Sequence, residues 1–272
     1  MNPQPADTTA TMAVFLDLEN IALGARDAKF PEFDIRKVLE RLLLKGHTVV
    51  KKAYCDFSRY KDFKRSLHEA AFELIEIPHI RQSGKNSADI RMVVDALDLC
   101  YTKSHLDTFV IISGDSDFSP LVSKLRENAK TVIGVGVKNS TSDLFINNCD
   151  EFIYYDDLVR AAASKRPPKT ARETPTAASP KPPEEKASGP SVAGALELLT
   201  ETLEALRAER DDDEGIWASA IKMAMKRRNP GFNERAHGFP SFSDLLLDAQ
   251  KRGLLKLDPK KQGGGYRVQP PE

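Results

Sequence analysis

Strand-length apolar runs alternate with helix-period segments through residues 12–154 of the chain. The runs are rich in Val and Ile and lack the apolar/polar alternation of half-exposed strands, which is typical of parallel strands buried on both faces. Strand-like runs cover residues 12–16, 48–54, 74–77, 109–112, 131–137 and 152–154, and helical segments cover residues 35–44, 63–72, 88–101, 121–125 and 144–147. These strand–helix units predict an α/β fold, a parallel sheet flanked by helices on both faces.

A proline-rich stretch at residues 161–190 separates this region from the rest of the chain. Its prolines lie among Ala, Lys, Ser and Thr, so the stretch predicts an extended linker. The linker's net positive charge either adds weak attraction for phosphate or simply keeps a spacer solvated. Residues 191–270 read as three helices and a β-hairpin, the order of elements in a small α+β winged helix. The predicted domains are therefore residues 12–160 and 191–270.

The cysteines and the apolar runs restrict where the protein can function. Cys55, Cys100 and Cys149 are widely spaced and form no CxxC pair, which favours a reduced intracellular protein without a zinc framework. The longest apolar runs have the length of strands, and the N-terminus is polar. Neither a membrane span nor an export signal is predicted, and we expect a cytoplasmic location.

Two of the predicted strands end in acidic residues. The run at residues 109–112 leads into a short polar turn that carries Asp115 and Asp117. In open α/β sheets, ligands bind just beyond the carboxyl ends of the strands. We expect Gly114 to permit a sharp bend there, so that both carboxylates project from the sheet edge. The first strand-like run ends in the same way, in Asp17.

A fourth carboxylate, Asp89, lies where a loop turns into the predicted helix at residues 88–101. The start of that helix should come near the same crevice, so Asp89 can converge with the aspartates at the strand ends. Each acid alone could merely cap a helix or complement a helix dipole. Together they favour a hard divalent cation, Mg²⁺ or Mn²⁺, and phosphodiester hydrolysis. The predicted catalytic and metal-binding residues are Asp17, Asp89, Asp115 and Asp117.

Three further side chains are candidates for positioning a substrate phosphate. Lys85, as a point charge, and Asn20, as an amide, could each orient phosphate oxygens, although an exposed loop lysine is equally ordinary. We expect Ser113 either to bond a metal-bound water, to hold Asp115, or only to make a local turn bond.

Other chemistries lack their motifs. The five histidines do not have HExxH spacing, and the chain contains neither a GxSxG elbow nor a P-loop. Gly134-Val135-Gly136 lacks the third glycine of a dinucleotide fingerprint. Basic and acidic residues number 40 each, so net charge alone does not indicate nucleic acid.

The acidic motifs, in their order along the chain, resemble those of NYN domain proteins, LabA-like members of the PIN-like nuclease superfamily. The resemblance covers about residues 12–157 and is carried by residues 15–20 (FLDLEN), 85–89 (KNSAD) and 113–118 (SGDSDF). It implies a PIN-like α/β fold and Mg²⁺- or Mn²⁺-dependent cleavage of RNA. The metal-binding residues that it implies are Asp17, Asp89 and Asp115, with Asp117 as a further candidate.

The C-terminal region resembles an OST-HTH/LOTUS module over about residues 190–270. The carriers are Gly231-Phe232, the segment 238–246 (GFPSFSDLL) and the final Gly-Tyr-Arg-Val. Such modules are winged helices that bind RNA or protein partners, and their pairing with a NYN domain is a recurrent architecture.

Two groups of residues in this module are candidates for RNA contact. We expect its phenylalanines to be core residues rather than base-stacking platforms, because Phe is usually buried; they are Phe232, Phe239 and Phe242. A basic cluster at a helix C-terminus complements the helix dipole and is also a candidate for contact with RNA phosphates; it consists of Lys226, Arg227 and Arg228.

The sequence therefore predicts a metal-dependent endoribonuclease acting on RNA, with a LOTUS module that recruits RNA or a protein partner; a homodimer is compatible with it. A non-catalytic RNA- or protein-binding adaptor on the same fold is the alternative. A third class is another phosphotransfer enzyme. Asp115-x-Asp117 resembles a Toprim DxD, but that family gives Asp89 no role, and Glu19 stands where a HAD-type phosphatase needs an aspartate.

Overall fold

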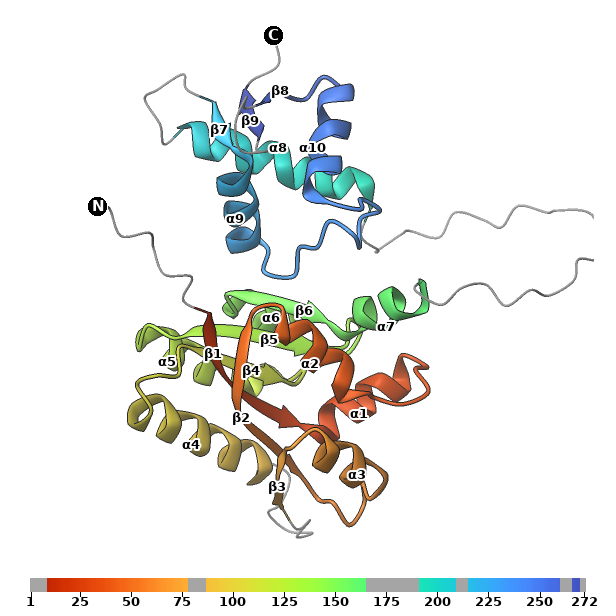
Figure 1. Cartoon of the computed structure of the whole chain (residues 1–272), viewed down its shortest axis with the longest axis vertical. Coiled ribbons are helices and arrows are strands. Elements are labelled where there is room, and N and C mark those ends of the chain that lie inside the picture. Colours follow the sequence, from red (N-terminus) through yellow and green to blue (C-terminus); the bar gives the residue numbers. More distant parts are fainter. Residues whose placement is uncertain (1–8, 78–86, 165–190, 209–214, 260–265, 270–272) are drawn as a thin grey trace, which may run out of the picture. The chain divides into compact units, whose positions relative to one another are not determined.

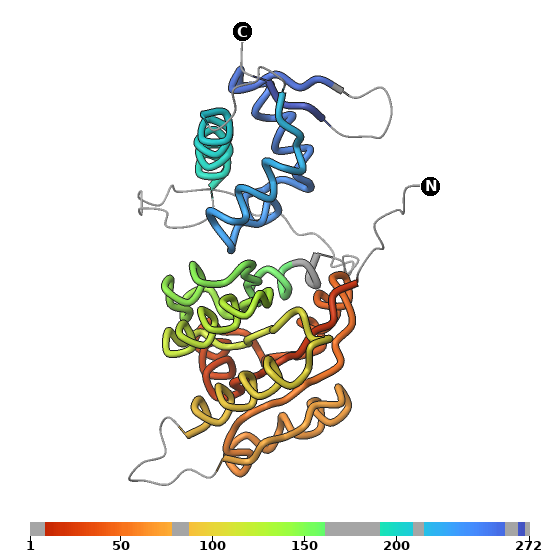
Figure 2. The backbone as a smooth tube through the Cα atoms, turned by 90° about the vertical axis from the view of Figure 1, so that its left-hand side faces the viewer, coloured from red at the N-terminus to blue at the C-terminus, as the bar shows by residue number. Residues whose placement is uncertain are grey.

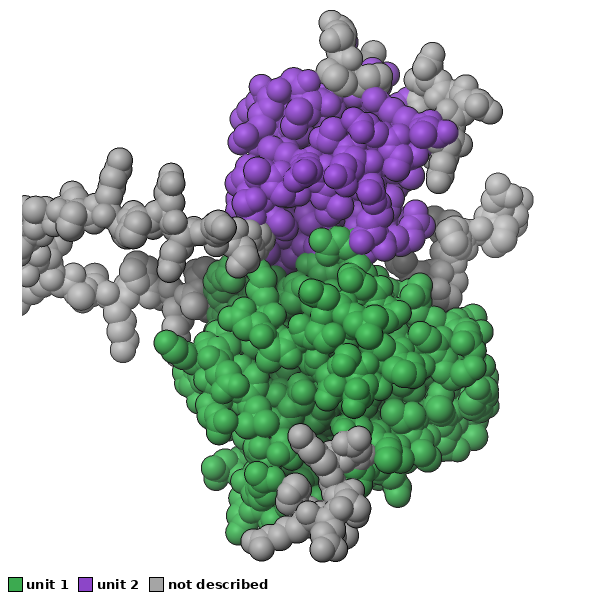
Figure 3. Space-filling model, turned by 180° about the vertical axis from the view of Figure 1, so that it is seen from behind, with its two compact units in different colours: residues 1–160, 229–231 green, residues 161–228, 232–272 purple. Residues whose placement is uncertain are grey.

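The computed structural model of the chain describes residues 9–77, 87–164, 191–208, 215–259 and 266–269. The chain forms two compact units, residues 1–160 with 229–231 and residues 161–228 with 232–272 (Figure 3). Most of the predicted linker, from residue 165 to 190, lies outside the described residues. Helix α7 ends at Ser164, inside the segment that the sequence assigns to the linker.

The first unit is built on a six-stranded sheet in which every neighbouring pair is parallel (Figure 1). The strands are β1 (Ala10–Asp17), β2 (Gly46–Cys55), β3 (Glu73–Glu76), β4 (Thr108–Ile112), β5 (Thr131–Gly136) and β6 (Glu151–Tyr154). Their order is β3-β2-β1-β4-β5-β6. The parallel sheet and all six predicted strands are confirmed.

Two apolar cores cover the two faces of this sheet, a layering that can be followed in Figures 1 and 2. Because side chains alternate along a strand, Val14 and Leu16 of β1 join one core while Phe15 joins the other. The helices of the first core are α1 (Leu18–Asp27), α2 (Ile35–Leu43), α3 (Asp62–Glu69) and α7 (Tyr155–Ser164). Those of the second are α4 (Ser87–Thr102), α5 (Ser119–Glu127) and α6 (Asp143–Asn148).

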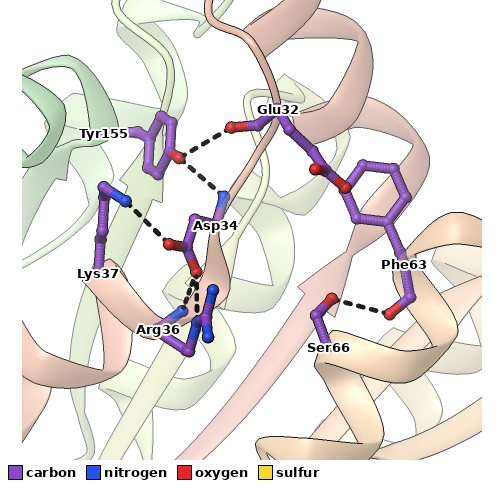
Figure 4. Close-up of polar contacts among 7 residues, drawn as sticks. All are labelled: Glu32, Asp34, Arg36, Lys37, Phe63, Ser66 and Tyr155. Carbon is purple, nitrogen blue, oxygen red and sulfur yellow. Dashed lines mark hydrogen bonds and ion pairs between the residues drawn. The ribbon is translucent and has the colours of Figure 1, made fainter.

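The connection between α1 and α2 is fixed against the end of β6 by one buried tyrosine (Figure 4). The Tyr155 hydroxyl accepts a hydrogen bond from Asp34 N at 2.8 Å and donates one to the Glu32 carbonyl at 3.3 Å. Asp34 caps α2 and also receives hydrogen bonds from Arg36 and Lys37. Burial raises the pKa of Asp34, but the bonds from Lys37 and Arg36 outweigh it, so the pKa lies below its ordinary value.

Helix α5 begins differently from the sequence prediction. The sequence predicts Ser119 as an N-cap before Pro120, whereas the structure places Ser119 inside the helix after the 3-10 turn η2 (Ser116–Phe118). The carboxylate of Asp115 caps that turn by accepting from Asp117 N at 3.0 Å. The 3-10 turn thus moves the cap upstream to Asp115, and the prediction for Ser119 is wrong.

Replacing Ser119 with alanine is therefore expected to leave the free energy of unfolding unchanged or raise it by up to about 1 kcal/mol. Its hydroxyl is buried and finds no hydrogen-bond partner among the described residues, and such burial costs about 1–3 kcal/mol. Ser142→Ala is the matched control, because Ser142 caps α6 by accepting from Leu144 N; it should lose about 0.5–2 kcal/mol. Urea denaturation followed by circular dichroism measures both, and a marked loss in Ser119→Ala would contradict this account.

The second unit packs three helices against a small antiparallel sheet, and it confirms the predicted winged-helix order with one added strand. The elements are α8 (Val192–Ala208), β7 (Ile216–Trp217), α9 (Ala218–Arg228), α10 (Phe242–Lys251), β8 (Lys256–Pro259) and β9 (Tyr266–Gln269). The strand order is β7-β9-β8. The three phenylalanines predicted as core are buried there; they are Phe232, Phe239 and Phe242. The predicted glycine loop at residues 263–265 lies outside the described residues.

Two further observations bear on the expected environment of the protein. Cys55, Cys100 and Cys149 are all free and buried. No helix within the described part of the chain has the length and apolar character needed to cross a membrane.

Candidate active site

The candidate site lies where strand order reverses in the sheet. Strands β1 and β4 are neighbours, and the helices that follow them, α1 and α5, pack on opposite faces. Such a switch point leaves a crevice beyond the carboxyl ends of the two strands. Asp17 is the last residue of β1, and Ser113 directly follows β4, whose Ile112 is paired with Leu16. The topology therefore brings the two acidic strand ends side by side.

A single buried hydroxyl ties the two strand ends together. Ser113 Oγ donates a hydrogen bond to Asp17 Oδ2 at 2.9 Å and accepts one from Asp115 N at 3.2 Å. Ser113 has no exposed surface, so in this conformation it orients the acids and does not reach a substrate. The bond from Asp115 N, two residues along the chain, is the local turn bond that the sequence left open. The bond to Asp17 was not among the predicted alternatives.

A second clamp joins α1 to the turn after β4. Asn20 Oδ1 accepts a hydrogen bond from Gly114 N at 2.7 Å, and the Gly114 carbonyl accepts one from Ser142 N at 3.0 Å. A Cβ atom on Gly114 would stand 2.5 Å from the Ser140 carbonyl oxygen. Gly114 is not among the glycines with a positive φ, so the close approach of the Ser140 backbone is what requires a glycine at this position.

Asp17 caps a helix, and its pKa is unusual for a residue in that role. Like Asp34, it accepts a hydrogen bond from the helix that it precedes, here from Asn20 N at 3.3 Å. The pKa of Asp34 is lowered, whereas burial and, to a smaller extent, the charges of Asp89 and Asp115 raise the pKa of Asp17 to about 7. The bonds from Ser113 and Asn20 oppose this rise without cancelling it. A purely structural cap does not require such a costly environment.

The other predicted acids lie within electrostatic reach of Asp17 or of Asp89 at this edge of the sheet. Asp89 lies in the first turn of α4 and is half-buried. Burial, followed by the charges of Asp115, Asp117 and Glu19, raises the pKa of Asp89 to about 6. All four predicted aspartates therefore belong to one electrostatic cluster, and Glu19 joins it.

Negative charge extends along the ends of the neighbouring strands. Cys55 ends β2, and burial raises its pKa to about 12, with further contributions from Glu19, Asp17, Asp56 and Glu76. Glu76 in turn ends β3. The edge of the sheet from β3 to β4 is thus acidic, which favours cations at this edge and repels a polyanion.

The carboxylates fit a hard divalent cation in their chemistry, because such ions prefer oxygen ligands. A cation would also offset the burial and the mutual repulsion that raise the pKa of Asp17 and Asp89. Within the described residues, no three His, Cys, Asp or Glu side chains form a ready group for a metal ion. Metal binding by the four aspartates therefore stays a prediction. Lys85, the predicted phosphate contact, lies outside the described residues.

The predicted basic cluster of the second unit occupies the last turn of α9. Arg228 donates to Glu201 and Thr202 of α8, both at 3.3 Å, so part of its role is structural. Arg227 is exposed, and Lys226 is half-buried. Their contact with RNA stays a prediction.

Two charged residues of the acidic edge were not given a role from the sequence. Glu19 belongs to the FLDLEN motif, but only the structure shows its charge acting on Asp89. Arg59 Nη1 lies 3.4 Å from Glu19 Oε1, although forty residues separate the two. Because this contact depends on the tertiary fold, no local sequence signal could have predicted it.

Comparison with known families gives two matches along the chain. The model of the NYN domain matches residues 11–156, and that of the OST-HTH/LOTUS domain matches residues 195–258. The two matched segments lie in the first and second units, respectively.

Curated relatives align over part of the chain. The Meiosis regulator and mRNA stability factor 1 of Xenopus tropicalis is 25% identical over 167 residues, and that of Mus musculus is 23% identical over the same length. The alignments cover 61% of this chain but only 10% and 9% of those proteins, so the chain spans about a tenth of their length. An uncharacterised protein of Methanocaldococcus jannaschii is 30% identical over 120 residues, which are 44% of this chain and 47% of that protein.

A solved structure has a similar fold. It is a protein of unknown function from Vibrio parahaemolyticus, which superimposes with a TM-score of 0.50 and is 26% identical. The superposition covers 57% of this chain and 98% of that structure.

Proposed function

The chain belongs to the NYN domain family, and we propose that it is a Mg²⁺- or Mn²⁺-dependent endoribonuclease whose OST-HTH/LOTUS domain recruits RNA or a protein partner. The observation that carries this proposal is the environment of Asp17. This carboxylate is buried at a topological switch point beside other acids, and its pKa is raised to about 7. The name of the curated relatives, which refers to mRNA stability, supports RNA as the substrate.

In this mechanism, Asp17, Asp89 and Asp115 would hold the metal, and Asp117 would bind a second ion or orient water. The metal supplies activation of water and stabilisation of the leaving oxygen when it is bound. Ser113 fixes the orientation of the Asp17 carboxylate through its hydrogen bond to Oδ2. Such outer contacts commonly contribute about 10- to 100-fold to metal affinity or activity.

Other residues of the chain would handle the substrate. Asn20, whose Oδ1 is engaged with Gly114, can offer only its amide nitrogen to a phosphate, and Lys85 adds positive charge. In the second unit, exposed Arg227 with Lys226 and Arg228 would contact RNA phosphates. The LOTUS domain thus supplies affinity, and the NYN domain supplies chemistry.

The test is cleavage of end-labelled RNA by the full chain. We expect internal cleavage with Mn²⁺ or Mg²⁺ and none with a chelator, because the carboxylates alone offer neither an activated water nor a stabilised leaving oxygen. Asp115→Asn, purified in parallel, distinguishes the protein's own activity from a contaminating nuclease. Equal cleavage by wild type and Asp115→Asn, or none by either, would contradict the proposal. RNA binding without turnover would instead support the adaptor.

A further inference from the structure

An acidic site that acts on RNA has to attract a polyanion. Asp17, Glu19 and Asp89 repel phosphates before any cation is bound. Arg59 is a positive side chain held at this edge, because its guanidinium pairs with Glu19 at 3.4 Å. Arg59 lies in the connection between β2 and α3, on the flank of the switch-point crevice.

This connection and the start of α3 combine positive charge with aromatic rings. Residues 59–65 contain four basic residues and one acidic residue; they are Arg59, Lys61, Lys64 and Arg65, against Asp62. Arg59, Lys61 and Arg65 are exposed. The Lys64 amine lies over the ring of Phe57 at 5.8 Å. Exposed cations among aromatic rings are a common composition of surfaces that bind single-stranded nucleic acid.

Tyr60 is a half-buried ring in a fixed position within this segment. It packs on the first core and lies 6.4 Å from the ring of Phe63 at a tilt of 47°. The backbone of Phe63 is held in turn, since its carbonyl accepts a hydrogen bond from Ser66 Oγ at 3.0 Å (Figure 4). The guanidinium of Arg59 lies over the Tyr60 ring, 6.0 Å from its centroid. A base that stacks on this ring would therefore lie beside Arg59 or take its place, while the packing of Tyr60 on the core stays intact.

Glu19 links this ring to the aspartate cluster. Burial and then the charge of Glu19 raise the pKa of Tyr60, and Glu19 also acts on the pKa of Asp89. Glu19 therefore lies within electrostatic reach of both groups. The ion pair between Glu19 and Arg59 is accessible, with side chains 41% and 50% exposed. Such a pair contributes at most about 1 kcal/mol, so Arg59 can exchange Glu19 for a phosphate at little cost.

We propose that Arg59 and Tyr60 form a binding site for single-stranded RNA beside the acidic crevice, with one base stacked on the Tyr60 ring and neighbouring phosphates contacted by Arg59 and Lys61. This inference deepens the proposed function and rests on it for the identity of the polymer. Single-stranded RNA is favoured over a duplex because stacking on a side chain requires an unpaired base.

The test is photo-crosslinking of the full chain to a labelled single-stranded RNA that contains 4-thiouridine, with a chelator present so that no cleavage occurs. Mass spectrometry of the digested complex is expected to find RNA attached to the peptide that contains Tyr60. A duplex of the same sequence should give no such attachment, because its bases are not free to stack. Crosslinks that avoid residues 57–65 would overturn the proposal.

Variants test the same site through cleavage. Tyr60→Ala is expected to raise KM about fivefold or more, because the loss of base stacking weakens RNA binding by at least that factor. We expect kcat to stay within about twofold of wild type, because the aspartates are unchanged. Tyr60→Phe keeps the ring and should behave as wild type. Arg59→Ala should also raise KM and weaken its salt dependence. Wild-type KM in both Tyr60→Ala and Arg59→Ala would contradict the proposal.

Matched controls lie at the opposite edge of the sheet. Tyr101, near the end of α4, is 65% exposed, and Tyr101→Ala should leave KM unchanged. Arg126 is 48% exposed and paired with Asp150 at 3.2 Å, much like Arg59 with Glu19, so Arg126→Ala is the control for loss of a paired arginine. If the protein does not cleave RNA but its Tyr60 peptide still crosslinks to RNA, the binding site is supported and the nuclease proposal fails.

Discussion

Replacing Asp17 with asparagine is expected to lower RNA cleavage more than about 100-fold and, in the chelated protein, to raise the free energy of unfolding near pH 8 by about 1–3 kcal/mol. The loss of activity follows from removal of a predicted metal ligand, since loss of even an outer contact of a metal site costs about 10- to 100-fold. The gain in stability follows from removal of a buried charge that Asp89 and Asp115 repel. Opposite effects on activity and stability are characteristic of a functional residue.

The pH dependence of this gain has a defined sign. The pKa of Asp17 is raised from 3.8 to about 7 in the folded protein, so folding binds a proton between these values. Its ionisation then destabilises the fold as pH rises from about 4 to about 7. The advantage of the asparagine variant should therefore be full above about pH 7 and disappear below about pH 4. The gain is smaller than the full ionisation penalty because Asn20 N and Ser113 Oγ donate to different oxygens of the Asp17 carboxylate, and asparagine has an NH2 group in place of one of them.

Asp34→Asn is the matched control, because Asp34 caps a helix in the same way as Asp17 but has a lowered pKa. It should lose stability near neutral pH, and this loss should disappear as pH falls through the lowered pKa. Thermal unfolding with and without Mn²⁺ completes the comparison: the ion should raise the Tm of wild type and not that of Asp17→Asn. If Asp17→Asn were destabilised like Asp34→Asn, Asp17 would be an ordinary cap.

The sheet and the acidic strand ends could be predicted because their signals are local. A buried parallel strand such as β4 is an unbroken apolar run, and the rule that ligands bind at carboxyl ends then places Asp17 and Asp115 at one edge. Helix α1 was not predicted, because it begins immediately after Asp17 without an intervening turn. The sequence places the cap at Ser119, four residues after the true cap Asp115, because a 3-10 turn has no distinct sequence pattern.

The contacts that organise the site could not be predicted from the sequence. Ser113 reaches Asp17 across 96 positions, and Asn20 reaches Gly114 N across 94. Serine and asparagine make many local bonds in loops, so their type does not reveal which partner the fold supplies. Gly114 illustrates the same limit: the residue type was informative, but the reason for it, close approach of the Ser140 backbone, exists only in the folded chain.

Gly114→Ala is expected to lower the free energy of unfolding by about 1–3 kcal/mol and RNA cleavage by about 10- to 100-fold. The added Cβ would stand 2.5 Å from the Ser140 carbonyl oxygen, which is closer than such atoms approach, and would make a tight contact of 3.2 Å with Asn20 Oδ1. The backbone has to shift, and overpacking of this kind costs about 1–3 kcal/mol. The shift strains the bond between Gly114 N and Asn20 and displaces the neighbouring Asp115. A displacement of about 1 Å at a catalytic group can lower the rate about 100-fold.

Gly194→Ala provides the matched control, because Gly194 lies in α8 of the second unit and the nearest atom to its Cβ position is Ser191 Oγ at 3.4 Å. It should be neutral or stabilising by up to about 1 kcal/mol. Trp217, the single tryptophan, lies in β7 of the same unit, so its fluorescence follows the second unit, whereas far-UV circular dichroism follows both. Gly114→Ala should lower the midpoint of the unfolding transition that circular dichroism reports for the first unit. The midpoint of the transition reported by Trp217 fluorescence should not change. Full activity and stability in Gly114→Ala would mean that the turn after β4 tolerates displacement, and that the clamp between Asn20 and Gly114 does not position the aspartates.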